Sequence, residues 1–288
     1  MNSKLPSWFK QEIPGKIVFE RSQILSDAGV HTVCVEAKCP NINTCFKSGK
    51  FTFLILGDTC TRNCRFCAVA KAEGASLSVD LKEPLCIAEA VKKLSLDYVV
   101  ITSVTRDDLA DGGAGVFARS IELIHEINKN IKVEVLIPDF RADENSLKCV
   151  LDASPDIAGH NIETVRRLYK DLRPLADYEV SLAVLRKIKE LKPGSITKSA
   201  LMLGLGERDE EVVDTIKDLR DNYCDILVLG QYLAPSPRYY PIKEFIAPEQ
   251  FQKYQKIGID MGFKVVLSAP KARSSYQAQK VYQEFYYA

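Results

Sequence analysis

Six short apolar runs alternate with helix-like segments along most of this chain, and this alternation restricts the possible folds more than any other feature. The runs lie at residues 51–56, 98–103, 132–137, 156–160, 196–203 and 225–230. Helix-like segments lie between or after them at 86–94, 116–127, 144–151, 163–171, 178–191, 209–221 and 248–260, and a last extended run lies at 264–267. Strands that alternate with helices are typical of parallel sheets with right-handed crossovers. We predict an α/β fold of six βα units that forms a barrel or a partial barrel.

Several small or polar residues lie at or just after the predicted carboxyl ends of these strands. They are Cys60, Ser103, Asn161, Gly204 and Gln231. Ligands of parallel α/β folds bind at this end of the strands, both in barrels and in open sheets. We therefore expect the functional site at this edge.

The composition limits the class of protein but does not identify a binding partner. The chain has 288 residues, 46% of them hydrophobic, so it can bury a sizeable core. Its formal net charge of +1 gives no argument for nucleic acid or an anionic membrane as a partner. No apolar run approaches the roughly 20 residues of a transmembrane helix, and residues 1–10 lack the apolar core of a secretion signal. We expect a soluble, cytoplasmic protein that binds neither nucleic acid nor membrane.

The cysteines argue for metal binding. Nine cysteines are present, and six of them fall within residues 34–67. An odd number clustered in this way does not suit a disulfide framework, so ligation of a metal or cluster is the better interpretation. Cys86, Cys149 and Cys224 lie apart on helix-like or helix-end stretches and are expected to be structural.

The spacing CxxxCxxC at Cys60, Cys64 and Cys67 can place three thiolates around one metal centre and leave a further position open. The alternatives are three buried small residues or a zinc knuckle. Structural zinc usually takes four ligands in paired CxxC units, whereas this spacing offers three. Polar neighbours such as Arg62 and Arg65 suit a loop around a charged centre. Iron–sulfur ligation fits best, because thiolates are the usual ligands of such clusters.

With Phe66 before its last cysteine, and at the end of the first predicted strand, this motif resembles the radical S-adenosylmethionine superfamily. The resemblance implies a four-iron four-sulfur cluster held by the three cysteines, with S-adenosylmethionine on the fourth iron. It also implies cleavage of that cofactor to a 5′-deoxyadenosyl radical. The fold would be a partial (β/α)6 barrel of the radical S-adenosylmethionine type over residues 49–262, with an N-terminal extension at 1–48 and a C-terminal extension at 263–288.

A second triad, Cys34, Cys39 and Cys45, lies just upstream in a stretch predicted to be a loop, after a possible helix at 18–28. A loop that is cysteine-rich by chance is the plain alternative. Two triads in this order suggest two clusters and resemble the lipoyl synthase family. Other similar stretches are 35–41, 100–109 with 111–114, 159–161 with 163–164, 230–233 and 273–276.

The resemblance implies that Cys34, Cys39 and Cys45 bind an auxiliary four-iron four-sulfur cluster with Ser275 as its fourth ligand. A serine oxygen holds iron less firmly than a thiolate would, which suits a cluster that must release sulfide. From the residues alone, Ser274 and Ser275 would be a turn or a helix cap. The choice of Ser275 over Ser274 depends on the family only.

The resemblance also implies contacts to S-adenosylmethionine, with Phe66 near the adenine. Taken singly, the polar residues among these positions would be caps, turn residues or a solvated charge. For Arg173 the family suggests pairing with a carboxylate or assistance to the substrate, and His160 would orient a strand end. The implied cofactor-binding residues are Phe66, Thr102, Ser103, Asn161, Arg173, Met202, Gly204 and Gln231.

The activity that this resemblance implies is that of a sulfurtransferase of lipoate biosynthesis and protein lipoylation. Two sulfur atoms would be inserted at C6 and C8 of an octanoyl chain on a lysine of a lipoyl carrier domain. The carriers would be 2-oxoacid dehydrogenase complexes or the glycine-cleavage H protein. Two S-adenosylmethionine molecules would be used per turnover, and the auxiliary cluster would supply the sulfur. Further expected partners are an electron donor such as flavodoxin or ferredoxin and an iron–sulfur carrier that repairs the cluster.

Two other classes of function remain open on the residues. One is another sulfur-inserting or methylthiolating radical enzyme, although no added RNA-binding domain follows residue 270. The other is a non-catalytic iron–sulfur scaffold or a zinc-binding module. The iron and zinc content of the purified protein separates this second class from the first.

Overall fold

An eight-stranded sheet organises the computed structural model, which describes residues 5–9, 15–72 and 77–287. Parts of the expected N-terminal extension, at 1–4 and 10–14, therefore lie outside the described residues. The sheet order is β1-β2-β5-β6-β7-β8-β9-β10. The strands are β1 (His31–Thr32), β2 (Thr52–Ile55), β5 (Tyr98–Ser103), β6 (Lys132–Leu136), β7 (Ile157–Gly159), β8 (Ile196–Leu203), β9 (Ile226–Gln231) and β10 (Val265–Ser268).

All neighbouring strands from β2 to β10 are parallel, and β1 alone pairs antiparallel with β2. Among the described residues, the edge strands β1 and β10 do not pair with each other, so the barrel is partial. The predicted α/β architecture with six βα units is confirmed. The last extended run becomes β10, which adds a seventh parallel strand to the series from within the segment expected as a C-terminal extension.

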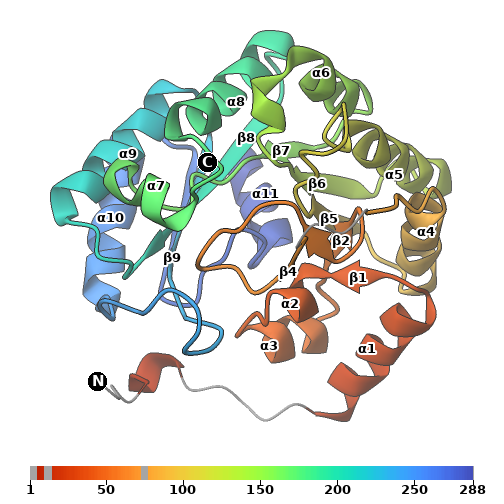
Figure 1. Ribbon diagram of the computed structural model, residues 1–288, viewed down its shortest axis with the longest axis horizontal. Helices are drawn as coiled ribbons and strands as arrows, with labels where there is room; N and C mark the ends of the chain where they lie inside the picture. Colours follow the sequence, from red (N-terminus) through yellow and green to blue (C-terminus); the bar gives the residue numbers. More distant parts are fainter. Residues whose placement is uncertain (1–4, 10–14, 73–76, 288) are drawn as a thin grey trace.

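Helices cover the outer face of this sheet, as Figure 1 shows. Each helix buries one apolar side. On α5 (Ala114–Ile127), for example, Phe117, Ile121 and Ile124 are fully buried. Side-chain caps fix where some helices begin. Asp177, for example, accepts hydrogen bonds from the first turn of α8 (Tyr178–Leu191). The crossover helices are α4 (Glu83–Lys93), α5 (Ala114–Ile127), α6 (Glu144–Asp152), α7 (Arg166–Leu172), α8 (Tyr178–Leu191), α9 (Asp209–Asp221) and α10 (Pro248–Asp260).

The structure differs from the sequence prediction in three places. Helix α4 begins at Glu83, because Pro84 is tolerated in a first turn. Helix α7 begins only at Arg166, since Glu163 has a φ of 69° and bridges to Leu201 of β8. The cysteine-rich stretch predicted as a loop contains two short helices, α2 (Val33–Glu36) and α3 (Ile42–Lys47). Helices this short show too little periodicity to be recognised in a sequence.

Helix α11 (Ala278–Tyr287) covers the amino-terminal ends of strands β7 to β10 and is seen behind the strands in Figure 1. Val281 of this helix packs against the first residues of several strands, Ile157, Ile196, Ile226 and Val265. Beside it lies a buried ion pair, in which Lys198 donates to Glu134 at 2.7 Å. Tyr98 donates to the same carboxylate at 2.7 Å, so the buried charges are paired and hydrogen-bonded.

The remaining elements lie at the N-terminal side and around the first cysteine loop. They are η1 (Ser7–Phe9), α1 (Lys16–Asp27), β3 (Thr59–Cys60), β4 (Ala70–Lys71) and η2 (Phe140–Ala142). No helix within 5–9, 15–72 and 77–287 has the length and apolar character needed to cross a membrane.

Gly230 is needed where the C-terminal segment crosses β9. A Cβ at this position would lie 2.0 Å from the carbonyl oxygen of Ala272, which is closer than any real contact. Gly230→Ala is therefore expected to destabilise the protein by about 1–3 kcal/mol, the usual range for overpacking. Thermal unfolding of the cluster-free protein measures this effect.

Gly194→Ala is the matched control, because a Cβ there has no atom within 4 Å. It should leave the unfolding temperature unchanged or raise it slightly. Equal stability of the two variants would contradict the close approach of Ala272 to β9.

Candidate active site

The loop between Cys60 and Cys67 is fixed at the carboxyl end of the sheet by backbone pairing. Strand β3 pairs with β4, and the amide of Ala72 donates to the carbonyl of Cys60 at 2.8 Å. Thr61 donates its amide to Thr105, just after β5, and Arg65 donates to Leu172 at the end of α7. The loop thereby spans from the first to the fourth βα unit.

Arg62 anchors the same loop to the rest of the protein through ion pairs. Its side chain is buried and pairs with Asp107 at 2.7 Å and with Asp139. Hydrogen bonds and charge from this guanidinium outweigh the burial of Asp139 and lower the pKa of that carboxyl to about 2. A paired, buried arginine within a three-cysteine loop holds the backbone rigidly while the thiols remain directed to one side.

The three thiols of this loop line one cavity, which we call the cysteine-loop cavity. Its other polar lining residues include Thr102, Ser103, His160, Asn161, Glu163 and Arg173. The Cys60 sulfur accepts hydrogen bonds from the amides of Arg62 at 3.4 Å and Thr105 at 3.3 Å. Burial raises the pKa of the Cys64 and Cys67 thiols, so a bound cation is needed to stabilise their thiolates at neutral pH.

Three buried polar atoms around this cavity have no hydrogen-bond partner among the described residues. They are Oγ of Ser103, Nε2 of His160 and Nε of Arg173. Buried polar groups are nearly always paired, so these atoms indicate a polar ligand. Donors and acceptors of this kind fit the amino, carboxylate and ribose groups of S-adenosylmethionine.

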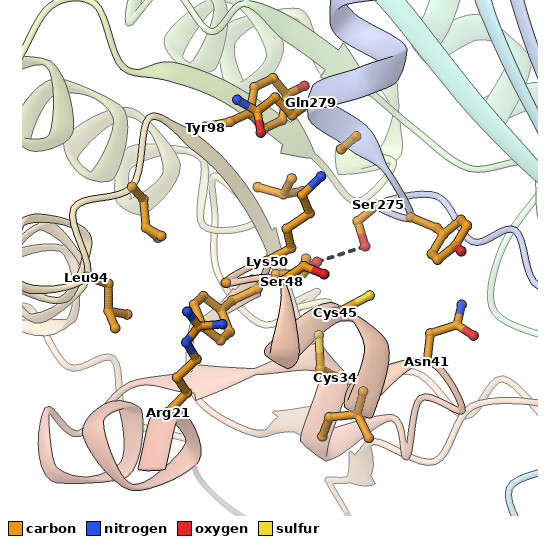
Figure 2. Close-up of a pocket in the computed structure, with 18 of the residues that line it drawn as sticks. Arg21, Cys34, Asn41, Cys45, Ser48, Lys50, Leu94, Tyr98, Ser275 and Gln279 are labelled. Atoms are coloured by element: carbon orange, nitrogen blue, oxygen red, sulfur yellow. Dashed lines mark hydrogen bonds between the residues drawn. The ribbon is translucent and has the colours of Figure 1, made fainter. Parts of the chain in front are cut away.

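The second triad is assembled by the two short helices. Cys34 lies in α2, Cys45 lies in α3, and Cys39 lies between them with its amide bound to the carbonyl of Cys34 at 3.0 Å. Cys34, Cys39 and Cys45 line a cavity of about 270 Å³, which we call the lower cavity. Figure 2 shows Cys34 and Cys45 directed into it. Burial raises the pKa of Cys34 to about 12 and that of Cys45 to about 11. These thiols too are suited to a bound cation.

Ser275 faces this second triad, although it lies more than 200 residues away in sequence. It lines the lower cavity, and its hydroxyl accepts a hydrogen bond from Thr52 at 2.8 Å (Figure 2). Ser274 points elsewhere and donates to Asn161 at 3.0 Å. The segment is held in place by Asn41, whose side chain donates to the carbonyl of Lys271 at 2.6 Å.

The sulfur donors of each triad border a cavity and do not converge on a single metal position. Among residues 5–9, 15–72 and 77–287, no three His, Cys, Asp or Glu side chains converge to hold a single metal ion. A closed zinc site has such convergence, with four ligands at 2.0–2.3 Å. Thiols are the usual ligands of iron–sulfur clusters, so the chemistry of both donor sets fits such a cluster, the first with three thiols and the second with three thiols and a hydroxyl.

A third cavity of about 260 Å³, the central cavity, lies between the two triads. Cys67, Phe66 and Asn161 border it from the first triad's side, and Cys34, Cys39 and Ser275 border it from the second. Much of the remaining wall is apolar and comes from the sheet, with Leu136, Ala200, Leu201, Met202 and Val228. The geometry thus joins the two candidate metal centres through one apolar space.

Two predicted cofactor contacts lie away from these cavities. The Gln231 amide donates to the carbonyls of Tyr232 and Glu244, both at 3.0 Å, and accepts from the amide of Ile246. Gly204 lies against it, since a Cβ there would be 2.1 Å from the Gln231 nitrogen. In this structure the pair anchors the segment after β9, whereas Phe66, Thr102, Ser103, Asn161, Arg173 and Met202 line a cavity.

Sequence reasoning did not single out Glu163 or Arg273 as site residues. Glu163 lines the cysteine-loop and central cavities and accepts from Asn161 at 3.0 Å. Arg273 lines the central and lower cavities. Both are charged residues inside stretches whose family resemblance was noted, and that combination is the signal that could have found them.

Comparisons with known proteins agree with this geometry. A sequence model described as the radical SAM superfamily matches residues 54–219. Lipoyl synthase of Caldicellulosiruptor saccharolyticus is 53% identical over 281 residues, covering 97% of this chain and 98% of its own. The chain belongs to the lipoyl synthase family.

A second member of the lipoyl synthase family, from Aquifex aeolicus, is 50% identical over 261 residues and covers 91% of this chain and 94% of its own. Among solved structures, a maturase of the [FeFe]-hydrogenase matches with a TM-score of 0.58 at 14% identity, over 93% of this chain and 67% of that one. At this identity the likeness concerns the fold alone. Lipoyl synthases are sulfur-inserting radical enzymes, so this chain is an enzyme of that class.

His160 makes stability depend on pH in a defined window. Burial, with the charge of Arg173, lowers its pKa to about 4, so the folded state holds it neutral while the unfolded state protonates it below about 6.5. The stabilisation of the folded state by neutral, buried His160 is complete above pH 6.5 and is lost as the pH falls towards 4. The loss should be about 3 kcal/mol, and chemical denaturation of the cluster-free protein at pH 7 and 4.5 measures most of it.

His160→Asn should reduce this pH dependence, since the titrating group is gone. His125→Asn, on the partly exposed face of α5, is the matched control and should leave it unchanged. An identical loss of stability in His160→Asn and in the unaltered protein would contradict the assignment.

Proposed function

We propose that this enzyme inserts two sulfur atoms, at C6 and C8, into an octanoyl chain attached to a lysine of a lipoyl carrier domain. The observation that carries this proposal is the apolar central cavity, which both cysteine triads border. An acyl chain suits its apolar wall, and one position in it can be reached from both sides. The name of the relatives, lipoyl synthase, agrees with such a product.

The two triads would have separate tasks. Cys60, Cys64 and Cys67 would hold a four-iron four-sulfur cluster beside S-adenosylmethionine. Cys34, Cys39, Cys45 and Ser275 would hold the auxiliary cluster that is used up as the sulfur source. When bound, these groups supply a 5′-deoxyadenosyl radical that removes hydrogen from carbon and a sulfide that bonds to that carbon, twice per product with two S-adenosylmethionine molecules.

The chain's own residues would bind and orient these partners. The unpaired Ser103 and Arg173 atoms lie where a polar cofactor group can satisfy them. Phe66 lines both the cysteine-loop cavity and the central cavity, so its ring can pack on an adenine while it also bounds the acyl site. Burial of the remaining wall excludes water from a radical intermediate.

An octanoyl-lysine arm would enter between two partly exposed stretches at the rim of the central cavity. These stretches are residues 38–40 and 233–235, which both line that cavity. The carriers would be domains of 2-oxoacid dehydrogenase complexes or the glycine-cleavage H protein. We also propose a flavodoxin or ferredoxin as electron donor, an iron–sulfur carrier for repair, and a cytoplasmic location.

Separate alanine variants of the two triads test the division of tasks. Cys34→Ala should still cleave S-adenosylmethionine but form no lipoyl product, whereas Cys64→Ala should do neither. Anaerobic incubation with a reductant, S-adenosylmethionine and an octanoyl-lysine peptide, followed by mass analysis, measures both reactions. The unaltered protein should contain about eight irons when both clusters are loaded. Lipoyl product from Cys34→Ala, or zinc in place of iron, would overturn the proposal.

Ser275 is tested by its replacement with a stronger ligand. Ser275→Cys should keep the iron content but slow sulfur insertion ~10-fold or more, because a thiolate binds iron more firmly than a hydroxyl. Ser274→Ala is the neighbouring control and should retain the auxiliary cluster, since Ser274 contacts Asn161. The reverse pattern, with cluster loss only in Ser274→Ala, would assign the ligand to Ser274.

A further inference from the structure

The auxiliary triad lies between two cavities that open at different ends of the barrel. Cys34, Cys39 and Ser275 line both the central cavity and the lower cavity, whereas Cys45 lines the lower cavity only. No residue of the Cys60–Cys67 loop lines the lower cavity. One side of the auxiliary site therefore faces the central cavity, which the Cys60–Cys67 loop also borders, and another side faces the lower cavity.

Strand positions show which end each cavity occupies. Tyr98 and Val100, from the first half of β5, line the lower cavity, while Thr102, from its second half, lines the central cavity. Alternate residues of a strand point to the same face, so these three side chains form one column inside the barrel. Thr52, the first residue of β2, borders both spaces. The lower cavity lies at the amino ends of the strands and the central cavity lies at their carboxyl ends.

The lower cavity also reaches the surface by itself. Four of its lining residues, Ser48, Lys50, Ser95 and Asp97, are exposed, in contrast to the buried Cys34 further inside. They come from the end of α3, the loop before β2 and the loop between α4 and β5. Gln279 of α11 donates to Asp97 at 3.0 Å and closes the remaining side.

Two basic residues lie near Cys45 at the surface opening of the lower cavity. The amide of Lys50 donates to the carbonyl of Cys45 at 2.9 Å, and the Lys50 ammonium acts on the Cys45 thiol electrostatically. Arg21 also lines the cavity and donates to the carbonyl of Lys47 at 2.8 Å. Hydrosulfide and thiolate-ligated iron–sulfur clusters are both anions, which such a mouth would attract.

We infer that the lower cavity is the route by which iron and sulfide re-enter the auxiliary site after a turnover, separate from the route of the octanoyl substrate. This inference rests on the proposed function, in which that cluster is consumed. Entry from the amino-terminal end would reach Cys45 first, without passing the radical site. Rebuilding could then proceed while a carrier domain or its product still occupies the central cavity.

The test measures cluster uptake rather than activity. Cys60, Cys64 and Cys67 are replaced by alanine so that only the auxiliary site can load. The cluster-free protein is given ferric iron, sulfide and excess dithiothreitol under nitrogen, in which the dithiol reduces part of the iron and holds it as anionic thiolate complexes. Visible absorbance and bound iron are followed in time. Ser48→Trp should slow uptake about fivefold or more, because an indole covers about 150–250 Å² and obstructs the mouth. Ser48→Ala should load as the parent does.

Leu233→Trp is the control at the opening of the central cavity. Leu233 lines the central cavity and does not line the lower cavity. This variant should hinder lipoylation of an octanoyl peptide but leave uptake unchanged. Lys50→Glu should slow uptake by about 10-fold at low ionic strength and less at high salt, whereas Lys50→Gln should have a smaller effect. Normal uptake in Ser48→Trp, or slowed uptake in Leu233→Trp, would overturn the inference.

A single-turnover assay separates this inference from the proposed function. Ser48→Trp loaded with both clusters before purification should form its first lipoyl product at the parent's rate and then fail to recover in the iron and sulfide mixture. If the unaltered, fully loaded protein makes no lipoyl product, the proposed function fails while the uptake rates still report the route. If first turnover and recovery are both unaffected in Ser48→Trp, the route is wrong and the function stands.

Discussion

The pairing of β2 with β5 is the constraint on which the position of both cysteine triads depends. β2 has only four residues, and both triads lie close to it, with Cys45 before Thr52 and Cys60 after Ile55. Its parallel register with β5, from Thr52 opposite Val100 to Ile55 opposite Ser103, fixes its position in the barrel. A strand of this length spans about 10 Å. The strand thus separates two cysteine sets by a short, rigid distance and directs them to opposite ends of one apolar space.

Buried ion pairs hold the backbone around the two cysteine triads. Arg62 is paired on two sides by Asp107 and Asp139, and Lys198 is paired with Glu134 deeper in the barrel. Such pairs add little net stability but are costly to break, so they restrict the loops to one arrangement. Ser103, His160 and Arg173 differ from them, because each keeps a buried polar atom without a partner among the described residues. Structural and ligand-binding polar groups are therefore distinguishable by their hydrogen bonding.

The fold followed from the sequence more completely than the site did. All six predicted strands and their crossover helices are present, because the 2.0 and 3.6 residue periods are local properties of the chain. The helices around Cys34 and Cys45 were missed because each has fewer than two turns. Gly204 and Gln231, whose contact with the cofactor stays a prediction, lie against each other beside β9. A position at the end of a strand does not determine which way its side chain points.

By itself the sequence determined the parallel α/β architecture and the two thiol triads, since both are encoded in spacing along the chain. Tertiary structure decided which groups meet. Ser275 reaches Thr52 and the second triad only because β10 pairs with β9 and Gly230 lets the following segment cross that strand. It also decided that the triad of Cys34, Cys39 and Cys45 borders two cavities. Contacts over more than 200 residues depend on strand order and close packing, which no local pattern in the sequence records.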